Sequence, residues 1–255
     1  MCFHHLCKAK YLGALNEQLS VEQKRYLKGT PFWWFTKLNE LVKISHNMLS
    51  LLFNKWIERR GVFAVGNKVV QFNLLDMCLK LGLRICGEKI DLTKEVDDSE
   101  SRKFFCSGKV NVKSIYEFLL KFDEDMGGVK VFYSLYILLG ICEFLVPNRY
   151  GIVSPILFKI VDNVENIDEY NWGTIVYEYL ACSLGSTSMA LNNEKSTSHF
   201  HVVGCVYLVQ VSVYCLFCLQ VYYYILYIDV WVLFWFFSYG VLIIYLFATQ
   251  SSILG

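Results

Sequence analysis

Histidines and cysteines gather near both ends of the chain, and these residue types bind zinc or carry out thiol chemistry. The pair His4-His5 lies between Cys2 and Cys7, and His199-Phe200-His201 stands far along the sequence. Imidazole nitrogens and thiolate sulfurs are the donors that zinc prefers. Neither group has carboxylate or thiolate partners at a spacing typical of a metal site. The pattern therefore favours ordinary histidines, and we assign no metal ligand.

A C-x-x-C pair, Cys215-Leu216-Phe217-Cys218, has the spacing of redox and zinc sites. It stands in an apolar run without a second pair, which favours two buried thiols over a redox or metal role. The chain has 10 cysteines, and their spacing fits no disulfide framework. Cysteines inside apolar helices behave as small hydrophobic residues, so the sequence indicates a reducing compartment.

Acidic residues cluster between two predicted helices, at Asp162, Glu165, Asp168 and Glu169. A cluster of carboxylates could bind a cation, but the spacing lacks the glycine-anchored alternation of a calcium loop. Charges at helix ends and in a solvated turn are the favoured interpretation.

Basic residues are in excess over residues 1–60, which hold ten Lys or Arg against four Asp or Glu. Lys24-Arg25, Lys28 and Arg59-Arg60 could contact phosphate, although a solvated face of two helices is the favoured interpretation. The formal net charge of the whole chain is +1, which gives no overall attraction to nucleic acid or anionic lipid.

No catalytic motif accompanies these residues. The sequence holds no phosphate-binding glycine loop, nucleophile elbow or H-E-x-x-H zinc motif. We therefore assign no catalytic residue and no cofactor, and we predict that the protein is not an enzyme.

The elements that must position these residues are mostly helices. Apolar spacing, caps and glycine stops predict helices over residues 16–27, 47–59, 74–81, 112–122, 129–146, 155–161 and 172–184. The β-prone runs around Gly66-Asn67 predict a small hairpin over 62–72. Residues 85–110 read as a surface insertion and 186–198 as a polar linker. The fold class is mainly α: a helical globular domain with a small β-hairpin, followed by an apolar helical C-terminal tail.

The helix predicted over 129–146 is nearly all apolar and close to membrane-spanning length. Glu143 near its end and the stop Pro147-Asn148 favour a buried central helix over a membrane span. Asn171 is predicted to cap the helix that follows it, and Trp172 to anchor it in the core.

A series of landmarks runs through the chain in a fixed order. They are Thr30-Pro31-Phe32-Trp33, Leu52-Phe53-Asn54-Lys55-Trp56, Val70-Gln71-Phe72, Leu75-Asp76, Leu81-Gly82-Leu83, Gly87, Leu135-Tyr136-Ile137-Leu138, Phe144-Leu145-Val146-Pro147-Asn148, Tyr170-Asn171-Trp172 and Gly204-Cys205-Val206-Tyr207-Leu208. Over residues 30 to 210 this series resembles the aminotransferase-like plant mobile domain, and equally the related transposon-derived plant domain that precedes SUMO-protease-like domains.

The resemblance implies a mostly helical domain of a nuclear or transposon-derived plant protein, with no established catalytic residues. It divides the chain into an N-terminal helical extension (1–29), the plant-mobile-domain-like domain (30–200) and the apolar tail (201–255). A protease domain would bring its own Cys and His after this region, and we expect the chain to stop before it.

The tail is the most unusual part of the sequence. Val202 to Ala248 spans 47 residues with one charge, Asp229, and no Lys or Arg follows Lys195. One helix of that length would be about 70 Å long, more than twice the hydrocarbon core of a bilayer. Two helices would have to turn within 227–231, which holds no Gly, Pro or Asn. We expect the tail to leave the family's sequence after Gln210, through a retained intron or a mis-set gene boundary.

These observations predict a non-catalytic helical interaction domain of a transposon-derived plant protein, with a nuclear or cytoplasmic location and a protein partner. Nucleic acid is a further possible partner, with weaker support. The alternative is a membrane-anchored protein, in which one or two helices of the tail cross the bilayer and the N-terminal domain is cytosolic.

Overall fold

The computed structural model describes residues 2–39, 44–65, 68–96, 98–105, 108–122, 128–192 and 199–213. The chain forms two compact units, Met1–Gln210 and Val211–Gly255, and the first is considered below. Its first 29 residues pack within the same unit as the rest, and the unit ends at Gln210 rather than at 200. Of the tail that we predict to be helical, residues 206–213 form a helix, and the residues after 213 lie outside the described part of the chain.

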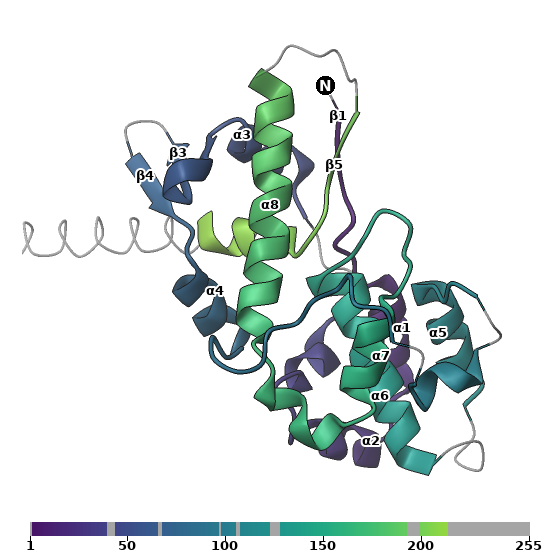
Figure 1. The fold of residues 1–255 in the computed structure, drawn as a ribbon. Coiled ribbons are helices and arrows are strands. Elements are labelled where there is room, and N and C mark those ends of the chain that lie inside the picture. The colour runs from purple at the N-terminus through teal and green to yellow at the C-terminus, as the bar shows by residue number, and fades with distance from the viewer. Residues whose placement is uncertain are drawn as a thin grey trace, which may run out of the picture. The chain divides into compact units, whose positions relative to one another are not determined.

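The first unit is mainly α with a small antiparallel sheet, as the sequence predicts (Figure 1). Its α-helices are α1 (Lys10–Gln18), α2 (Val21–Leu27), α3 (His46–Phe53), α4 (Leu74–Leu81), α5 (Val112–Leu120), α6 (Gly128–Gly140), α7 (Pro155–Val161) and α8 (Trp172–Asn192). Short 3-10 helices are η1 (Trp33–Lys37), η2 (Glu58–Arg60), η3 (Ser101–Phe104) and η6 (Val164–Glu169), and the π-helix η5 spans Ile141–Leu145. The strands are β1 (Cys2–His5), β2 (Trp56–Ile57), β3 (Val62–Val65), β4 (Lys68–Gln71) and β5 (His199–Val202).

Helix α6 and its continuation η5 form the centre of the core. Every residue from Phe132 to Val146 is buried, and α6 packs against α1, α2, α5 and α7. Within the described part of the chain, Gly128–Leu145 is the one helix long and apolar enough to cross a membrane, and 78% of it is buried inside the protein. A core helix passes the same test of length and composition, and the burial confirms the predicted central helix.

A carboxylate lies inside this core. Glu143, on η5, is 6% exposed, and its two oxygens accept hydrogen bonds from the backbone N–H groups of Tyr11 and Leu12, each at 2.9 Å. These N–H groups belong to the first turn of α1, where a helix leaves its donors without partners. Ala9 precedes the helix and offers no side-chain cap. Glu143 therefore caps α1 from a position far away in the sequence.

Asn16 makes the second polar connection between α1 and the core. Its amide nitrogen donates to the carbonyl oxygens of Phe35 and Leu38, both at 2.7 Å, and its amide oxygen accepts from the hydroxyl of Tyr136 at 2.5 Å. Burial raises the pKa of Tyr136, so the hydroxyl remains a donor. These bonds join α1 to η1 and α6.

Three predicted helix boundaries are wrong. The helix predicted over 16–27 is two helices, because Leu19 is extended and Ser20 begins α2 with a capping box to Gln23. The helix predicted over 47–59 ends at Phe53, since Trp56 pairs with Phe63 as part of β2. The helix predicted over 172–184 continues to Asn192, so part of the predicted linker is helical.

Gly185 explains the third error. Glycine often ends a helix in a left-handed conformation, but Gly185 is not among the glycines with positive φ. A Cβ atom there would collide with the side-chain carboxylate of Glu58. Gly185 therefore permits the close approach of η2 to α8 instead of ending the helix.

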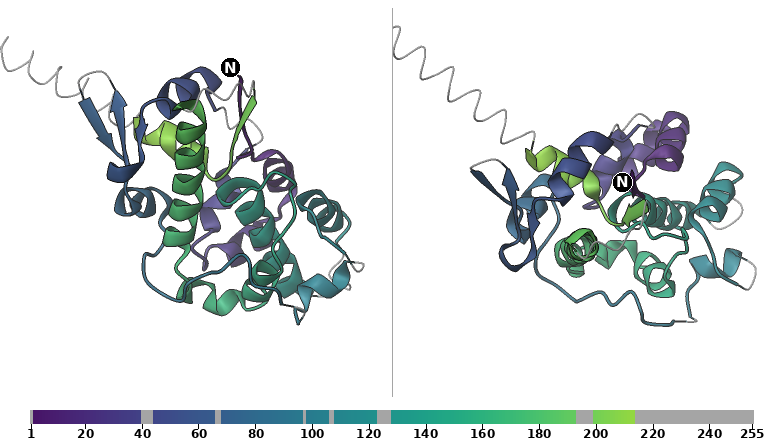
Figure 2. Two further views of the ribbon diagram at one scale, coloured as in Figure 1. Left: turned by 45° about the horizontal axis from the view of Figure 1, so that its top comes forward. Right: turned by 90° about the horizontal axis from the view of Figure 1, so that it is seen from above.

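The predicted hairpin is present and has a third strand. β3 pairs with β4 in antiparallel register from Val62↔Gln71 to Val65↔Lys68, and β2 adds to the other edge of β3. The predicted turn residues Gly66 and Asn67 lie outside the described residues. Asn73 then caps α4 and Gly82 ends it in the left-handed conformation, both as predicted. Both views in Figure 2 show α8 between this sheet and the helices α6 and α7.

A second sheet joins the two ends of the unit. β1 pairs with β5 in parallel, from Cys2↔His199 to His5↔Val202, and the two strands lie side by side in Figure 1. The sequence analysis predicts no strand at either place. Short strands of histidine and cysteine carry no β pattern of their own, and pairing between distant segments leaves no local signal.

The start of α8 is held by the segment that follows α4. The side chain of Asn171 accepts from the N–H of Thr174 and donates to the carbonyl of Ile85, which confirms the predicted cap. Trp172 is 2% exposed, as predicted for a core anchor. The N–H of Gly173 donates to the carbonyl oxygen of Arg84 at 2.9 Å. The backbone of Arg84 therefore lies against the first turn of α8.

We predict that replacing Glu143 by leucine lowers the free energy of unfolding by about 2 to 4 kcal/mol, because two buried donors lose their acceptor. Burial raises the pKa of Glu143, against the opposing effect of its backbone hydrogen bonds. A raised carboxyl pKa stabilises the fold below the unfolded-state value, and this contribution is lost as pH rises through the folded-state pKa.

Glu143→Gln should therefore gain stability relative to the wild type as pH rises from about 4 to 8. Guanidinium unfolding at several pH values, followed by circular dichroism, measures the difference. Glu117→Gln, at an exposed site on α5, serves as the control and should show no such trend. A pH-independent difference for Glu143→Gln would show that this carboxyl is not perturbed by burial.

Two glycines of α8 give a matched pair of substitutions. A Cβ at Gly173 would meet the Sγ of Cys78 and lie 2.6 Å from the backbone oxygen of Arg84, whereas a Cβ at Gly185 would meet only the flexible end of Glu58. We predict that Gly173→Ala lowers the free energy of unfolding by about 1 to 3 kcal/mol through overpacking. Gly185→Ala should stay within about 1 kcal/mol of wild type, because helix propensity offsets the displacement of Glu58. Thermal unfolding of both variants tests the contrast, and equal losses would contradict it.

Candidate binding surfaces

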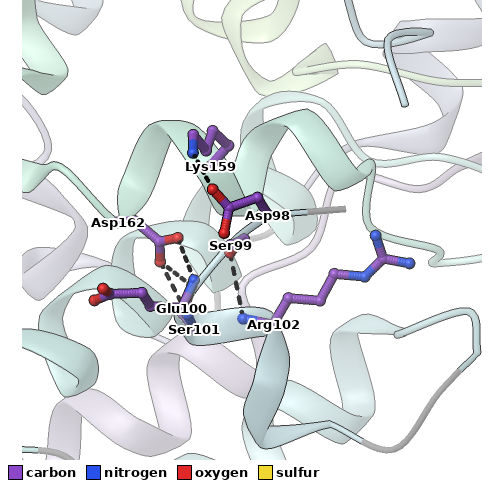
Figure 3. Close-up of polar contacts among 7 residues, drawn as sticks. All are labelled: Asp98, Ser99, Glu100, Ser101, Arg102, Lys159 and Asp162. Atoms are coloured by element: carbon purple, nitrogen blue, oxygen red, sulfur yellow. Dashed lines mark hydrogen bonds and ion pairs between the residues drawn. The ribbon is translucent and has the colours of Figure 1, made fainter. Parts of the chain in front are cut away.

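The acidic residues between α7 and α8 have separate structural roles. Asp162, at the end of α7, accepts hydrogen bonds from the N–H of Glu100 at 2.8 Å, the N–H of Ser101 at 3.0 Å and the hydroxyl of Ser101 (Figure 3). Lys159, on the same helix, pairs with Asp98 at 3.3 Å. Asp162 therefore caps η3 and attaches the segment before it to α7.

The other acidic residues are directed elsewhere. Asp168 forms an ion pair with Arg84 at 3.3 Å, and the backbone oxygen of Glu169 accepts from the N–H of Glu88 at 2.8 Å. Glu165 lines a hollow of about 360 Å³ beside Tyr26 and Tyr133. Asp162 and Asp168 thus place their charges at helix ends, where they contact residues 100–101 and Arg84.

The histidines at the two ends of the sequence meet on the β1–β5 sheet. The rings of His4 and His201 stack with centroids 5.4 Å apart and planes at 25°. On the other face, the ring of His5 lies 4.9 Å from that of His46 on α3. Among residues 2–213 whose side chains are described, no group of three or more His, Cys, Asp or Glu is placed to hold a metal ion.

His5 is held in its neutral form. Its Nδ1–H donates to the carbonyl oxygen of Cys7 at 2.9 Å. Burial, and then the neighbouring His46, lower its pKa to about 4. An imidazole fixed in this way supports the local fold.

The described cysteines include two buried thiols that lie together. The thiol of Cys7 donates to the carbonyl oxygen of Phe144 at 3.3 Å. Burial raises the pKa of Cys205, and the neighbouring Cys7 raises it further. The raised pKa of Cys205 disfavours its reactive thiolate form. The predicted C-x-x-C pair, Cys215 and Cys218, lies outside the described residues.

The basic residues lie on separate elements. Lys24 and Arg25 belong to α2, which packs against α6 and η1, whereas Arg59 and Arg60 belong to η2, which packs against α8. Arg25, Lys28, Arg59 and Arg60 are exposed. This arrangement matches the predicted solvated helix faces.

An open groove of about 610 Å³ runs between α8 and β5. Ser183, Ser186, Thr187 and Ala190 present small side chains from one face of the helix, and Phe200 lines the opposite wall. The hydroxyl of Ser183 accepts from the N–H of Val203 at 2.9 Å and thereby holds the end of β5 against α8.

Charged and titratable groups also line this groove. They are Arg149, Glu178, Tyr179, Cys182 and His201. The hydroxyls of Ser186 and Thr187 donate to the helix carbonyls four residues before them, which leaves their oxygens able to accept. A groove that combines positive and negative charges, hydroxyl groups and one aromatic wall can contact the mixed polar and apolar surface of a polypeptide.

The sequence analysis misses this groove because both walls depend on tertiary structure. α8 continues past Gly185, and β5 exists only by pairing with β1. A weak signal was present: small residues at 183, 186, 187 and 190 follow helical spacing beyond the predicted stop.

Comparison with known proteins gives one family. Residues 6–210 match the family described as Domain of unknown function (DUF8566). No curated protein and no solved structure shows a significant match. The match ends at the residue where the first compact unit ends, Gln210.

We predict that Asp162→Ala releases the segment before η3, because three donors lose their shared acceptor. The loss should lower the free energy of unfolding by about 1 to 3 kcal/mol. Limited trypsin digestion should cut faster after Lys94, Arg102 or Lys103 in this variant than in wild type. Glu165→Ala, whose side chain lines a neighbouring hollow, is the control and should be cut at the wild-type rate. Equal protection in both variants would show that Asp162 does not hold this segment.

Proposed function

We propose that this chain, which belongs to the DUF8566 family, is a non-catalytic helical interaction domain that binds a protein partner in the groove between α8 and β5. The observation that carries the proposal is the groove itself, which has a volume of about 610 Å³, lies between one helix and one strand, and is open to solvent.

The chemistry of the groove favours a polypeptide segment as the occupant. Arg149 and Glu178 offer charges of both signs, and the hydroxyl oxygen of Ser186, which is exposed, can accept from a backbone N–H group of a partner. Phe200 and Ala190 supply apolar contact. Protein interfaces combine these features, whereas small-molecule sites are more enclosed.

The use of the buried carboxylate supports a structural rather than a catalytic role. Glu143 receives two backbone hydrogen bonds at the start of α1. Asp162 receives three donors from the segment at η3. Carboxylates held in this way stabilise the fold and have their oxygens occupied.

The origin and location are part of the same proposal. The ordered landmarks between Thr30 and Leu208 resemble the plant mobile domain and its transposon-derived relative, which supports a transposon-derived plant protein in the nucleus or cytoplasm. The matched length, 6–210, is consistent with one domain of this size.

Membrane anchoring is the second candidate, and it rests on the apolar sequence after Gln210. The first residues of the apolar run do not contribute to it. Val202, Cys205, Val206 and Val209 are buried in the first compact unit, and the side chain of Gln210 accepts from the N–H of Ser45 at 2.7 Å. A membrane span would therefore have to lie within 211–255.

We predict that a double substitution in the groove, Ser186→Arg with Ala190→Arg, weakens partner binding without unfolding the domain. Two long cations should weaken the contact by about 2 kcal/mol or more, roughly thirtyfold. The measurement is quantitative mass spectrometry of cross-linked complexes from plant cells that express each variant, followed by binding assays with the purified partner.

Lys121→Glu is the control variant. It alters a hollow of about 660 Å³ that Phe104, Phe118 and Lys109 also line, on the α5 side. Retained binding in this variant and loss in the groove variant support the proposal. The reverse result, or recovery of nucleic acid that depends on Lys121, would contradict it and place the contact on the hollow beside α5.

A further inference from the structure

A hollow of about 360 Å³ lies where α2, α6 and η6 meet. Helix α6 packs against both α2 and η6, and α2 and α6 lie side by side near the bottom of Figure 1. Val129, Lys130 and Tyr133 line the hollow from one face of α6, since residues three and four apart are neighbours on a helix. Tyr26 lines it from α2, and Glu165 lines it from η6. Three elements thus surround one small space.

The walls of this hollow are fixed by contacts within the domain. Leu27 on α2 and Ile167 on η6 are 0% and 1% exposed, so both elements are anchored in the core. The hydroxyl of Thr30 donates to the carbonyl oxygen of Leu27 at 2.9 Å, and the indole N–H of Trp172 donates to the carbonyl oxygen of Ile167 at 2.6 Å. Ligand sites are usually pre-formed in this way.

Two tyrosines form an aromatic wall. The rings of Tyr26 and Tyr133 stack with centroids 5.2 Å apart and planes at 30°. Tyr133 is buried, whereas Tyr26 is 62% exposed and lies against it at the edge of the hollow. Aromatic faces and edges attract other rings in offset or edge-to-face arrangements. The wall therefore favours a ligand that carries a ring.

Two charges of opposite sign stand beside the aromatic wall. Lys130 and Glu165 are exposed, and among the residues that the structure describes neither side chain takes part in an ion pair or a hydrogen bond. Each can therefore take a counter-charge from a bound molecule. A phosphate site would offer several cations, and a site for a hard metal ion several carboxylates. One charge of each sign matches a zwitterion.

The volume limits the size of the ligand. Pockets for small molecules span about 300 to 1,000 Å³, and this hollow is at the lower end of that range. It suits a molecule of about 12 to 15 non-hydrogen atoms better than a nucleotide or a longer peptide. An amino acid with an aromatic side chain has this size, one ring and one charge of each sign.

We propose that the hollow binds a free α-amino acid with an aromatic side chain. The ring lies against Tyr26 and Tyr133, the carboxylate faces Lys130, and the ammonium group faces Glu165. The hollow shares no lining residue with the groove between α8 and β5, so this site goes beyond the proposed partner binding and does not depend on it.

The test compares three ligands that share one ring system and differ in charge. They are tryptophan, tryptamine, which lacks the carboxylate, and indole-3-propionate, which lacks the ammonium group. Isothermal titration calorimetry and saturation-transfer NMR with the full chain measure binding. We expect tryptophan to bind with a Kd of about 0.1 to 1 mM, as its size suggests. The other two ligands should bind at least about threefold more weakly, because each loses one ion pair.

Substitutions of the two charged residues should affect the ligands in opposite ways. Lys130→Met should weaken tryptophan and indole-3-propionate by about three- to tenfold without weakening tryptamine. Glu165→Gln should weaken tryptophan and tryptamine without weakening indole-3-propionate. Lys28→Met and Glu169→Gln are the matched controls, because both side chains are exposed on the same elements but do not line the hollow. Both controls should bind all three ligands as wild type does.

The aromatic wall is tested separately. Tyr26→Ala should weaken all three ligands at least about fivefold, whereas Tyr26→Phe keeps the ring and should bind nearly as wild type does. Circular dichroism of each variant checks the fold. The proposal is overturned if none of the three ligands binds below about 10 mM. It is also overturned if tryptamine or indole-3-propionate binds more tightly than tryptophan, or if the Lys130 and Glu165 variants change all three ligands equally.

Discussion

The packing of the domain depends on a carboxylate in its apolar centre. Glu143 lies within the buried helix α6–η5 and accepts the free backbone donors of α1. Taking a carboxylate out of water is costly, and charge-assisted hydrogen bonds and the positive end of a helix offset only part of that cost here, since burial still raises the pKa of Glu143. This one interaction orients α1 against the core, and Asn16 then joins α1 to η1 and to Tyr136. The N-terminal residues thereby pack within the first compact unit.

Local signals account for the elements that the sequence predicts well. Asn73 and Gly82 bound α4, Pro155 opens α7, and the β-prone residues of 62–65 and 68–71 form the hairpin. Each of these signals acts within a few residues, so no knowledge of the fold is needed. The mainly α class follows from the same local patterns. The predicted helix boundaries are wrong where a contact with another segment sets the end of the helix. Trp56 belongs to a strand because it pairs with Phe63, and Gly185 remains helical and accommodates Glu58.

At the candidate surfaces, too, the sequence predicts features that depend on neighbouring residues and misses those that depend on distant contacts. The sequence predicts the acidic residues as charges at helix ends, because this role depends only on neighbouring residues. Asp162 and Asp168 lie at helix ends in the structure. The histidine motifs are visible in the sequence, but the register that brings His4 to His201 is set by tertiary structure. The groove could not be predicted, since it requires both the last turns of α8 and a strand that exists only through its partner.

The parallel pairing of β1 with β5 has a consequence for how the domain is made. Parallel strands far apart in sequence close a large loop, and such contacts raise the contact order and slow folding. During synthesis the first strand leaves the ribosome long before the residues around Phe200 do. Until then the nascent chain carries an open strand edge, which is a site for wrong pairing with other chains. The order of translation therefore makes β1 the last strand to find its partner, although it is the first to be synthesised.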